Sequence, residues 1–187
     1  MSGINHRHIC KYVDSFVGSG THKLYTIMEY CDRGDLAQYL QRVQAMAKSN
    51  THFRMTSPSS SSAIHFELGE HKIWRFFLQI CLALEAVHEK GIVHADLKPS
   101  NLLMAGRDYD LKLTDFGISQ KLTPGYNFSH DFNGTIPYCS PEILNGERYN
   151  QKTDVWALGC ILYEMVVGKR AFDAVNEDGL KQKITAY

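Results

Sequence analysis

The chain has 187 residues, 44% hydrophobic and 21% charged, a composition typical of one globular domain with a sizeable core. Twenty basic and twenty acidic residues balance to a net charge of zero, which argues against nucleic-acid binding through phosphate electrostatics. The longest apolar run, residues 155–167, contains Glu164 and is too short to span a bilayer. We therefore expect no nucleic acid and no membrane among the partners.

The five cysteines are widely spaced and contain no C-x-x-C pair. They indicate neither a zinc site nor a disulfide framework, and they favour a reducing compartment, the cytoplasm or the nucleus. The N-terminal residues MSGINHRHICKY contain no apolar segment that would suggest a signal peptide.

Residues 9–17 and 24–30 are rich in β-branched and aromatic side chains and are joined by Gly18, Ser19 and Gly20, which predicts an antiparallel hairpin. Asp35 is placed to cap a helix that begins at Leu36. Residues 48–70 contain Pro58 and five serines around it, which predicts a mobile loop insertion. A phosphorylated regulatory segment is the alternative interpretation of these serines.

Residues 73–87 repeat apolar side chains at intervals of three and four, which predicts a long helix that Gly91 stops. Two short apolar segments, 101–106 and 111–117, predict a second hairpin. Residues 118–134 are typical of a loop. We expect helices again after Pro141, over 153–167 with most faces buried, and over 176–187.

The stretch HADLKPSN, residues 94–101, concentrates polar chemistry in one predicted loop. Asn101 and Asp115 would be brought together by the second hairpin, and their oxygens suit Mg²⁺, which takes its other ligands from water and phosphates. Asp96 could orient a hydroxyl and accept its proton, while Lys98 could place a positive charge against a transferred phosphoryl group.

These motifs resemble those of eukaryotic protein kinases. The pattern H-x-D-L-K-P-x-N followed by D-F-G at 115–117 resembles the catalytic loop and metal-binding motif of that family. GTIPYCSPE (134–142) is similar to its substrate-docking loop and A-P-E motif, with Ser140 in place of alanine. DVWALGCILYEMVVGKRAF (154–172) resembles its central helix, and LYTIMEYCDRGDL (24–36) its last small-lobe strand and hinge.

The resemblance implies an α+β fold that consists mainly of the helical large lobe, residues 31–187, with small-lobe strands and the start of the hinge in residues 1–30. Lys98 and Thr135 are similar to the serine/threonine-specific pattern, and the hinge and central helix resemble those of NIMA-related kinases in particular. The implied activity is transfer of the ATP γ-phosphate to a serine or threonine hydroxyl of a protein, with ATP and Mg²⁺ as cofactors.

Residue roles follow from the same resemblance. Asp96 would be the catalytic base, Lys98 the phosphate-facing lysine and Thr135 a bridge toward both. Asn101 and Asp115 would be metal ligands. The residues expected to contact the nucleotide are the gatekeeper Met28, the backbone of Glu29 and Cys31 for adenine, Asp35 for the ribose and Leu103 for the floor of the adenine pocket. Asp154 would brace the catalytic loop from the central helix.

The sequence also departs from the family pattern. It contains no G-x-G-x-x-G loop, no V-A-I-K-type lysine and no helix with the partner glutamate, and further helices follow this region in the family. We therefore expect a kinase domain truncated at both ends, with exposed apolar surface along 153–167 and little transfer activity on its own. A fragment of a complete kinase, a truncated gene product or start-site error, and a non-catalytic kinase-like interaction protein all stay open.

Ala95 stands where most of the family has an arginine that reaches a phosphate on the activation loop. The change is either a neutral loop substitution or a sign that activity is not switched through an arginine–phosphate pair. The hydroxyls that could carry a phosphate in this loop are Ser119, Thr123, Tyr126, Ser129 and Thr135.

Overall fold

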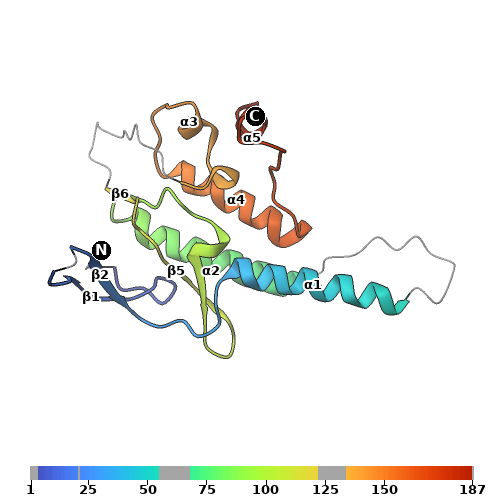
Figure 1. Cartoon of the computed structure of the whole chain (residues 1–187), viewed down its shortest axis with the longest axis horizontal. Helices are drawn as coiled ribbons and strands as arrows, with labels where there is room; N and C mark the ends of the chain where they lie inside the picture. Colours follow the sequence, from blue (N-terminus) through green and yellow to red (C-terminus); the bar gives the residue numbers. More distant parts are fainter. Residues whose placement is uncertain (1–3, 21, 55–67, 122–133, 187) are drawn as a thin grey trace.

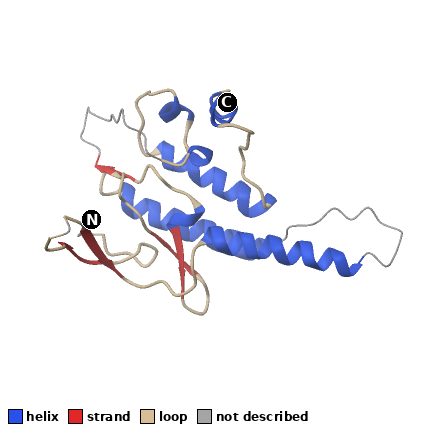
Figure 2. Cartoon of the chain, viewed as in Figure 1, coloured by secondary structure: helices blue, strands red, loops and turns tan. Residues whose placement is uncertain are grey.

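The computed structural model describes residues 4–20, 22–54, 68–121 and 134–186, with the backbone alone described for 49–54. Within these ranges the strands form three separate two-stranded antiparallel sheets, and helices make up most of the remaining regular structure (Figure 2). The mixture agrees with the predicted α+β class. No helix in these ranges is long and apolar enough to cross a membrane.

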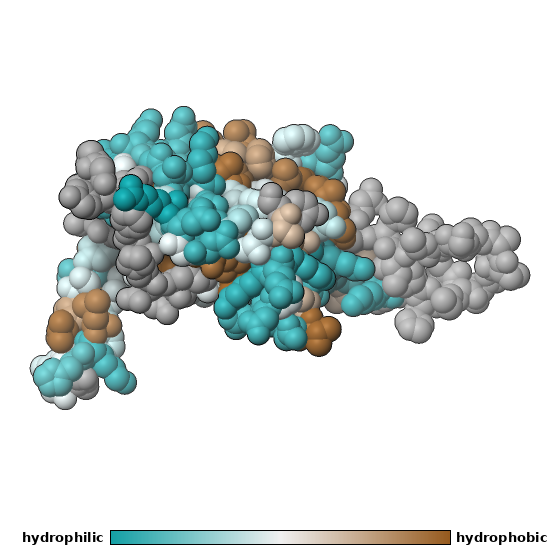
Figure 3. Space-filling model, turned by 90° about the horizontal axis from the view of Figure 1, so that it is seen from above, coloured by the Kyte–Doolittle hydropathy of each residue, from teal (hydrophilic) through white to brown (hydrophobic). Residues whose placement is uncertain are grey.

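The first sheet is the predicted N-terminal hairpin. Strands β1 (Tyr12–Val17) and β2 (Leu24–Met28) pair antiparallel, and the rings of Phe16 and Tyr25 stack at 5.2 Å between centroids. Most side chains of the hairpin are exposed, and Figure 3 shows brown, hydrophobic atoms on this projecting part of the molecule. The exposed large apolar residues here are Val13, Phe16, Val17, Leu24, Tyr25, Ile27 and Met28.

Helix α1 (Leu36–Arg54) begins as predicted. The Asp35 carboxylate accepts a hydrogen bond from the Gln38 backbone N–H at 2.8 Å, which is an N-cap contact, and Leu36 and Leu40 are buried. The prediction of a loop from residue 48 is wrong, because the helix continues through Arg54. The sequence has no glycine or proline in this region before Pro58, so nothing breaks the helix earlier. Residues 55–67 lie outside the described part.

The core is built on α2 (Glu70–His88) and α4 (Lys152–Val167), which pack against each other (Figure 1). The predicted apolar stripe of α2 is confirmed, with Phe76, Ile80, Leu84 and Val87 buried. We predicted that most faces of α4 would be buried, but one side of the helix is exposed to solvent. A helix buries only the stripe that meets a neighbouring element. The exposed apolar surface expected along this helix is present, at Val155, Tyr163, Val166 and Val167.

The second predicted hairpin is also confirmed. Strands β4 (Leu102–Ala105) and β5 (Asp110–Leu113) pair antiparallel, with Leu102 opposite Leu113. Helix α2 covers the hairpin, and the Gln79 side chain accepts from the Leu111 backbone N–H at 2.9 Å. The hairpin therefore fixes Asn101, just before β4, and Asp115, just after β5, at one end of the sheet.

The remaining elements are short. Strand β3 (Ile92–Val93) pairs with β6 (Gln120–Lys121), so part of the region predicted as loop is extended and paired instead. A two-residue strand has too short a pattern to be recognised from sequence alone. The 3-10 turns η1 (Pro99–Asn101) and η2 (Ile136–Tyr138) and the helices α3 (Pro141–Leu144) and α5 (Glu177–Thr185) complete the fold.

Candidate active site

The backbone of the HADLKPSN loop is held by one carboxylate from α4. Asp154 is 1% exposed and accepts hydrogen bonds from the backbone N–H groups of His94 and Ala95, both at 2.9 Å. It also accepts from Nε2 of His88 at 2.7 Å. These contacts confirm the predicted bracing role, and they compensate the cost of burying the carboxylate.

Ala95 has a φ of 64°, in the left-handed region that a residue with a Cβ rarely adopts. The hydrogen bond from its N–H to Asp154 helps to hold this conformation. Backbone strain of this kind persists where the surrounding contacts over-determine it, and it is typical of functional loops.

His94 connects the loop to the segment after β5. Its ring is fully buried, Nε2 donates to the Thr114 carbonyl at 2.9 Å, and Nδ1 accepts from the Asp96 N–H at 3.3 Å. Burial lowers the pKa of His94 below its ordinary value. The ring is therefore held neutral, with the proton on Nε2, and it fixes the backbone position of Asp96.

Asp96, Lys98 and Thr135 meet as the sequence predicted. Nζ of Lys98 lies 2.6 Å from Oδ2 of Asp96 and donates to Oγ1 of Thr135 at 2.8 Å. The Thr135 hydroxyl donates to Oδ1 of Asp96 at 2.9 Å, and the Thr135 N–H reaches the same oxygen at 3.1 Å. The Asp96 and Lys98 side chains are 10% and 22% exposed, so water screens the pair only weakly.

Asn101 belongs to the same network. Its Nδ2 donates to the backbone carbonyl of Asp96 at 2.8 Å and to Oδ2 of Asp96 at 3.1 Å. The amide is thereby oriented, and its Oδ1 is the atom suited to a metal ligand. The Asn101 carbonyl accepts from the Thr114 N–H at 3.0 Å, which places this loop directly beside the residue that precedes Asp115.

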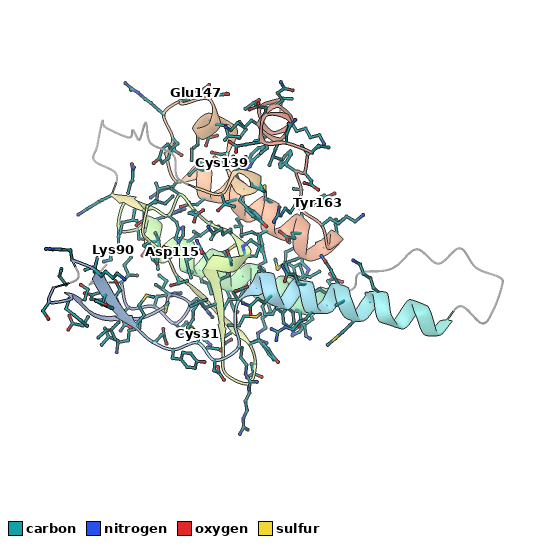
Figure 4. The ribbon with its side chains drawn as sticks, viewed as in Figure 1. Cys31, Lys90, Asp115, Cys139, Glu147 and Tyr163 are labelled. Atoms are coloured by element: carbon teal, nitrogen blue, oxygen red, sulfur yellow. The ribbon has the colours of Figure 1, made fainter. Side chains whose placement is uncertain are left out.

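Asp115 is exposed and has a φ of 58°, and its Oδ1 accepts from the Gly117 N–H at 3.3 Å. Figure 4 shows it near the middle of the molecule, beside α2. The hard oxygens of Asp115 and Asn101 fit Mg²⁺. The described residues contain no group of three or more His, Cys, Asp or Glu side chains that could hold a metal. A site of two protein ligands would depend on water and phosphate oxygens, as Mg²⁺ sites in phosphoryl-transfer proteins do.

A cavity of about 320 Å³ opens between the N-terminal hairpin and the segment after β5. Of the predicted site residues, Met28 and Asp115 line it, together with Cys10, Thr114 and Phe116. The cavity therefore reaches one candidate metal ligand, Asp115, on one side and Met28, the predicted gatekeeper, on the other.

The segment expected to bind adenine makes several contacts of its own. The Glu29 N–H donates to the Lys11 carbonyl at 2.9 Å, and the Glu29 carboxylate accepts from the Lys11 N–H at 2.6 Å and pairs with Lys112 at 3.0 Å. The Cys10 thiol donates to the Glu29 carbonyl at 3.7 Å. The sequence did not identify Cys10 and Lys112 as contacts of Glu29. A strand pattern predicts the strand but does not show which other segment its side chains will contact.

Asp35 and Leu103 form a β-bridge beside this segment, so the two predicted nucleotide contacts lie next to each other. Leu103 is half-buried on β4, and the Asp35 carboxylate is engaged in the N-cap contact. The nucleotide contacts of Met28, Glu29, Cys31, Asp35 and Leu103 stay predictions.

Comparisons with known proteins agree with this geometry. A family model described as the protein kinase domain matches residues 1–187. "Serine/threonine-protein kinase nekl-2" of Caenorhabditis elegans is 39% identical over 182 residues, covering 97% of this chain and 46% of that protein. Human "Serine/threonine-protein kinase Nek2" is 33% identical over 186 residues, covering 97% and 38%.

Mouse "Serine/threonine-protein kinase Nek1" is 36% identical over 184 residues, with 98% of this chain and 13% of that protein covered. The chain thus spans less than half the length of these curated relatives. The predicted resemblance to NIMA-related kinases is confirmed, and the chain belongs to the protein kinase family.

Proposed function

We propose that this protein is a serine/threonine kinase that transfers the γ-phosphate of ATP to a serine or threonine hydroxyl of a protein substrate. The observation that carries the proposal is the closed arrangement of Asp96, Lys98 and Thr135, with Asn101 bonded to the same carboxylate. The three relatives named above are all serine/threonine-protein kinases, which supports an enzyme over a non-catalytic interaction protein.

In this proposal Oδ1 of Asp96 accepts the proton of the substrate hydroxyl as that oxygen attacks the γ-phosphorus. The Thr135 hydroxyl and N–H hold Asp96 in place, at 2.9 and 3.1 Å. Lys98 bonds the other carboxylate oxygen, and its ammonium is placed to offset charge that develops on the phosphoryl group.

Asn101 and Asp115 would hold Mg²⁺, which when bound neutralises phosphate charge and orients the γ-phosphoryl group. Asn101 contributes in a second way, because its Nδ2 reaches both the carbonyl and the carboxylate of Asp96. The proposed metal ligand Asn101 therefore also positions the proposed base Asp96, so these two side chains are fixed relative to each other.

We also propose that residues 31–187 form the large lobe and residues 1–30 the last small-lobe strands and the start of the hinge. The support is that the β1–β2 hairpin leads directly through Glu29 and Cys31 into the segment that bridges β4. The cavity lined by Met28 and Asp115 lies between these two parts, where the proposed nucleotide would bind.

The test is the thermal shift of the purified chain with ATP alone and with ATP plus Mg²⁺. We expect ATP to raise the unfolding temperature and Mg²⁺ to increase that rise, because ligands that bind only the folded state stabilise it. Transfer of γ-phosphate to serine- and threonine-containing peptides is then measured on this chain and on any longer form. Asp96→Asn should lower transfer by roughly 10²–10⁴-fold. An unchanged unfolding temperature with Mg²⁺ and ATP would overturn the proposal.

A further inference from the structure

The segment that leads from β2 to α1 is held by the β4–β5 hairpin at both of its ends. At the α1 end the bonds join backbone groups. The Arg33 N–H donates to the Met104 carbonyl at 3.0 Å, and the Met104 N–H donates to the Gly34 carbonyl at 2.8 Å. At the β2 end the contact is an ion pair, in which Nζ of Lys112 lies 3.0 Å from Oε1 of Glu29. The two ends are therefore attached in different ways, one by backbone and one by side chains.

The place of Lys112 on β5 explains how it reaches this segment. Leu111 and Leu113 are buried in the core, so Lys112 lies on the opposite face of the strand, paired with Leu103 of β4. Leu103 in turn forms a β-bridge with Asp35, so the segment continues the hairpin beyond β4. Lys112 thus projects from the same face as the residue predicted to form the floor of the adenine pocket.

Glu29 uses each of its polar groups at the end of the β1–β2 hairpin. Its N–H donates to the Lys11 carbonyl at 2.9 Å, and its own carbonyl accepts from the Cys10 thiol at 3.7 Å. Its Oε1 accepts from the Lys11 N–H at 2.6 Å as well as from Lys112. The next residue, Tyr30, is 89% exposed, so packing of its side chain does not hold the segment. The position of the Glu29 backbone therefore depends on where its carboxylate is held.

The ion pair is partly shielded from water. The side chains of Lys112 and Glu29 are 19% and 29% exposed, so solvent screens their attraction less than that of a surface pair. Two donors on one oxygen also fix the orientation of the carboxylate. Loss of the lysine would leave a half-buried carboxylate with one donor fewer, which gives this end of the segment more freedom.

Strand β5 also leads to the candidate metal ligand, because Asp115 follows Lys112 by three residues. Between them, the Thr114 hydroxyl donates to Sδ of Met28 at 3.9 Å. Met28, Thr114 and Asp115 all line the cavity of about 320 Å³. The Lys112–Glu29 pair therefore joins the two sides of this cavity, the side expected to contact adenine and the side expected to hold the metal.

We propose that Lys112 is a positioning residue for nucleotide binding, which fixes the adenine-contacting backbone relative to Asp115 through its ion pair with Glu29. The inference rests on the proposed function, because it concerns the adenine end of the same nucleotide site. Without the lysine the segment is still tied at Arg33 and Gly34, so the fold is kept while the Glu29 end gains freedom. Binding of adenine must then order that end, and affinity falls by the cost of doing so.

The experiment is isothermal titration calorimetry of the full chain with adenosine, which carries no phosphate and so reports on the adenine end alone. Lys112→Met removes the charge and keeps the reach of the side chain. It should weaken adenosine binding by roughly 3- to 10-fold, between the effects expected of an exposed ion pair and of a buried charged hydrogen bond. Lys112→Arg should keep most of the affinity. Lys152→Met, at an exposed position on α4, is the matched control and should bind as wild type does.

Two further measurements distinguish positioning from a general loss of structure. In a Glu29→Gln background, Lys112→Met should change adenosine affinity little further, because the partner charge is already absent. The ratio of the ATP dissociation constants without and with Mg²⁺ should be the same in Lys112→Met as in wild type. Asp115→Ala should show the opposite pattern, with adenosine affinity kept and the Mg²⁺ ratio lost.

The outcomes separate this inference from the proposed function. A wild-type chain that binds neither ATP nor adenosine would overturn both. A wild-type chain that binds both, with an unchanged adenosine affinity in Lys112→Met, would overturn the inference alone. So would an affinity loss that persists in full in the Glu29→Gln background, since the lysine would then act through another group. If Lys112→Met does not fold, Glu29→Gln takes its place with the same expectation, because it keeps an acceptor for the Lys11 N–H.

Discussion

Lys98 and Asp96 form a 2.6 Å ion pair, and one hydroxyl closes it into a ring, since Oγ1 of Thr135 bonds both partners. Thr135 comes from the segment before η2, far from the catalytic loop in sequence. Docking of that segment therefore adds two hydrogen bonds to the contacts that position the proposed base, which couples the substrate-facing loop to the chemistry.

Thr135→Ala removes the bridging hydroxyl but keeps the backbone bond to Asp96. Hydrogen bonds to charged groups contribute roughly 1.5–3 kcal/mol, so transfer activity should fall by about 10- to 100-fold. Thr135→Ser retains the hydroxyl and should keep most of the activity. The ratio of kcat/KM values for the two variants is the measurement, and equal values would show that the hydroxyl does not position Asp96.

Asp115→Ala should leave folding largely unchanged, because the side chain is exposed and its protein partner is the nearby Gly117 N–H. It should eliminate the Mg²⁺-dependent part of the thermal shift with ATP and the transfer activity, since a two-residue metal site cannot lose one ligand. Asp108→Ala, at an exposed position in the β4–β5 turn, is the matched control and should behave as wild type. A full Mg²⁺ response in Asp115→Ala would remove Asp115 from the metal site.

The sequence was sufficient for the two hairpins, the stripe of α2 and the grouping of Asp96, Lys98 and Thr135, because hydrophobic period and ordered motifs are local signals. It was insufficient for the length of α1, where residues after Ala47 continue a helix that already exists although their own propensity is weak. It also could not show that Lys112 pairs with Glu29 or that the Cys10 thiol reaches the Glu29 carbonyl. Both contacts depend on where a hairpin docks, which no local pattern contains.

Asp154→Ala should destabilise the folded chain by roughly 3–5 kcal/mol, since it leaves buried donors without a partner. Those donors are His88 Nε2 and the N–H groups of His94 and Ala95. Urea denaturation followed by circular dichroism measures the loss, with Asp173→Ala, at an exposed position, as control. A change below about 1 kcal/mol, the size expected of an exposed ion pair, would contradict the bracing role.

His94 makes stability depend on pH. Its folded-state pKa is lowered by burial, so the unfolded chain binds more protons between that pKa and the ordinary value of 6.5. The stabilisation is therefore complete above about pH 6.5 and is lost as pH falls through and below that value. Urea unfolding at pH 7.5 and 5.5 tests the slope, and histidine NMR titration, with His94→Gln for assignment, tests the pKa directly. A His94 pKa at or above 6.5 would contradict the neutral ring.

Ala95→Arg tests whether the arginine expected at this position from the family pattern would change how activity is regulated. The proposed kinase has no guanidinium here to pair with an activation-loop phosphate, so its activity should change little on phosphatase treatment. The arginine variant should lose activity on the same treatment. Because Ala95 has a φ of 64°, Ala95→Gly is the control for backbone effects, as it accepts this conformation without adding charge. Equal phosphatase responses in all three proteins would favour a neutral substitution at position 95.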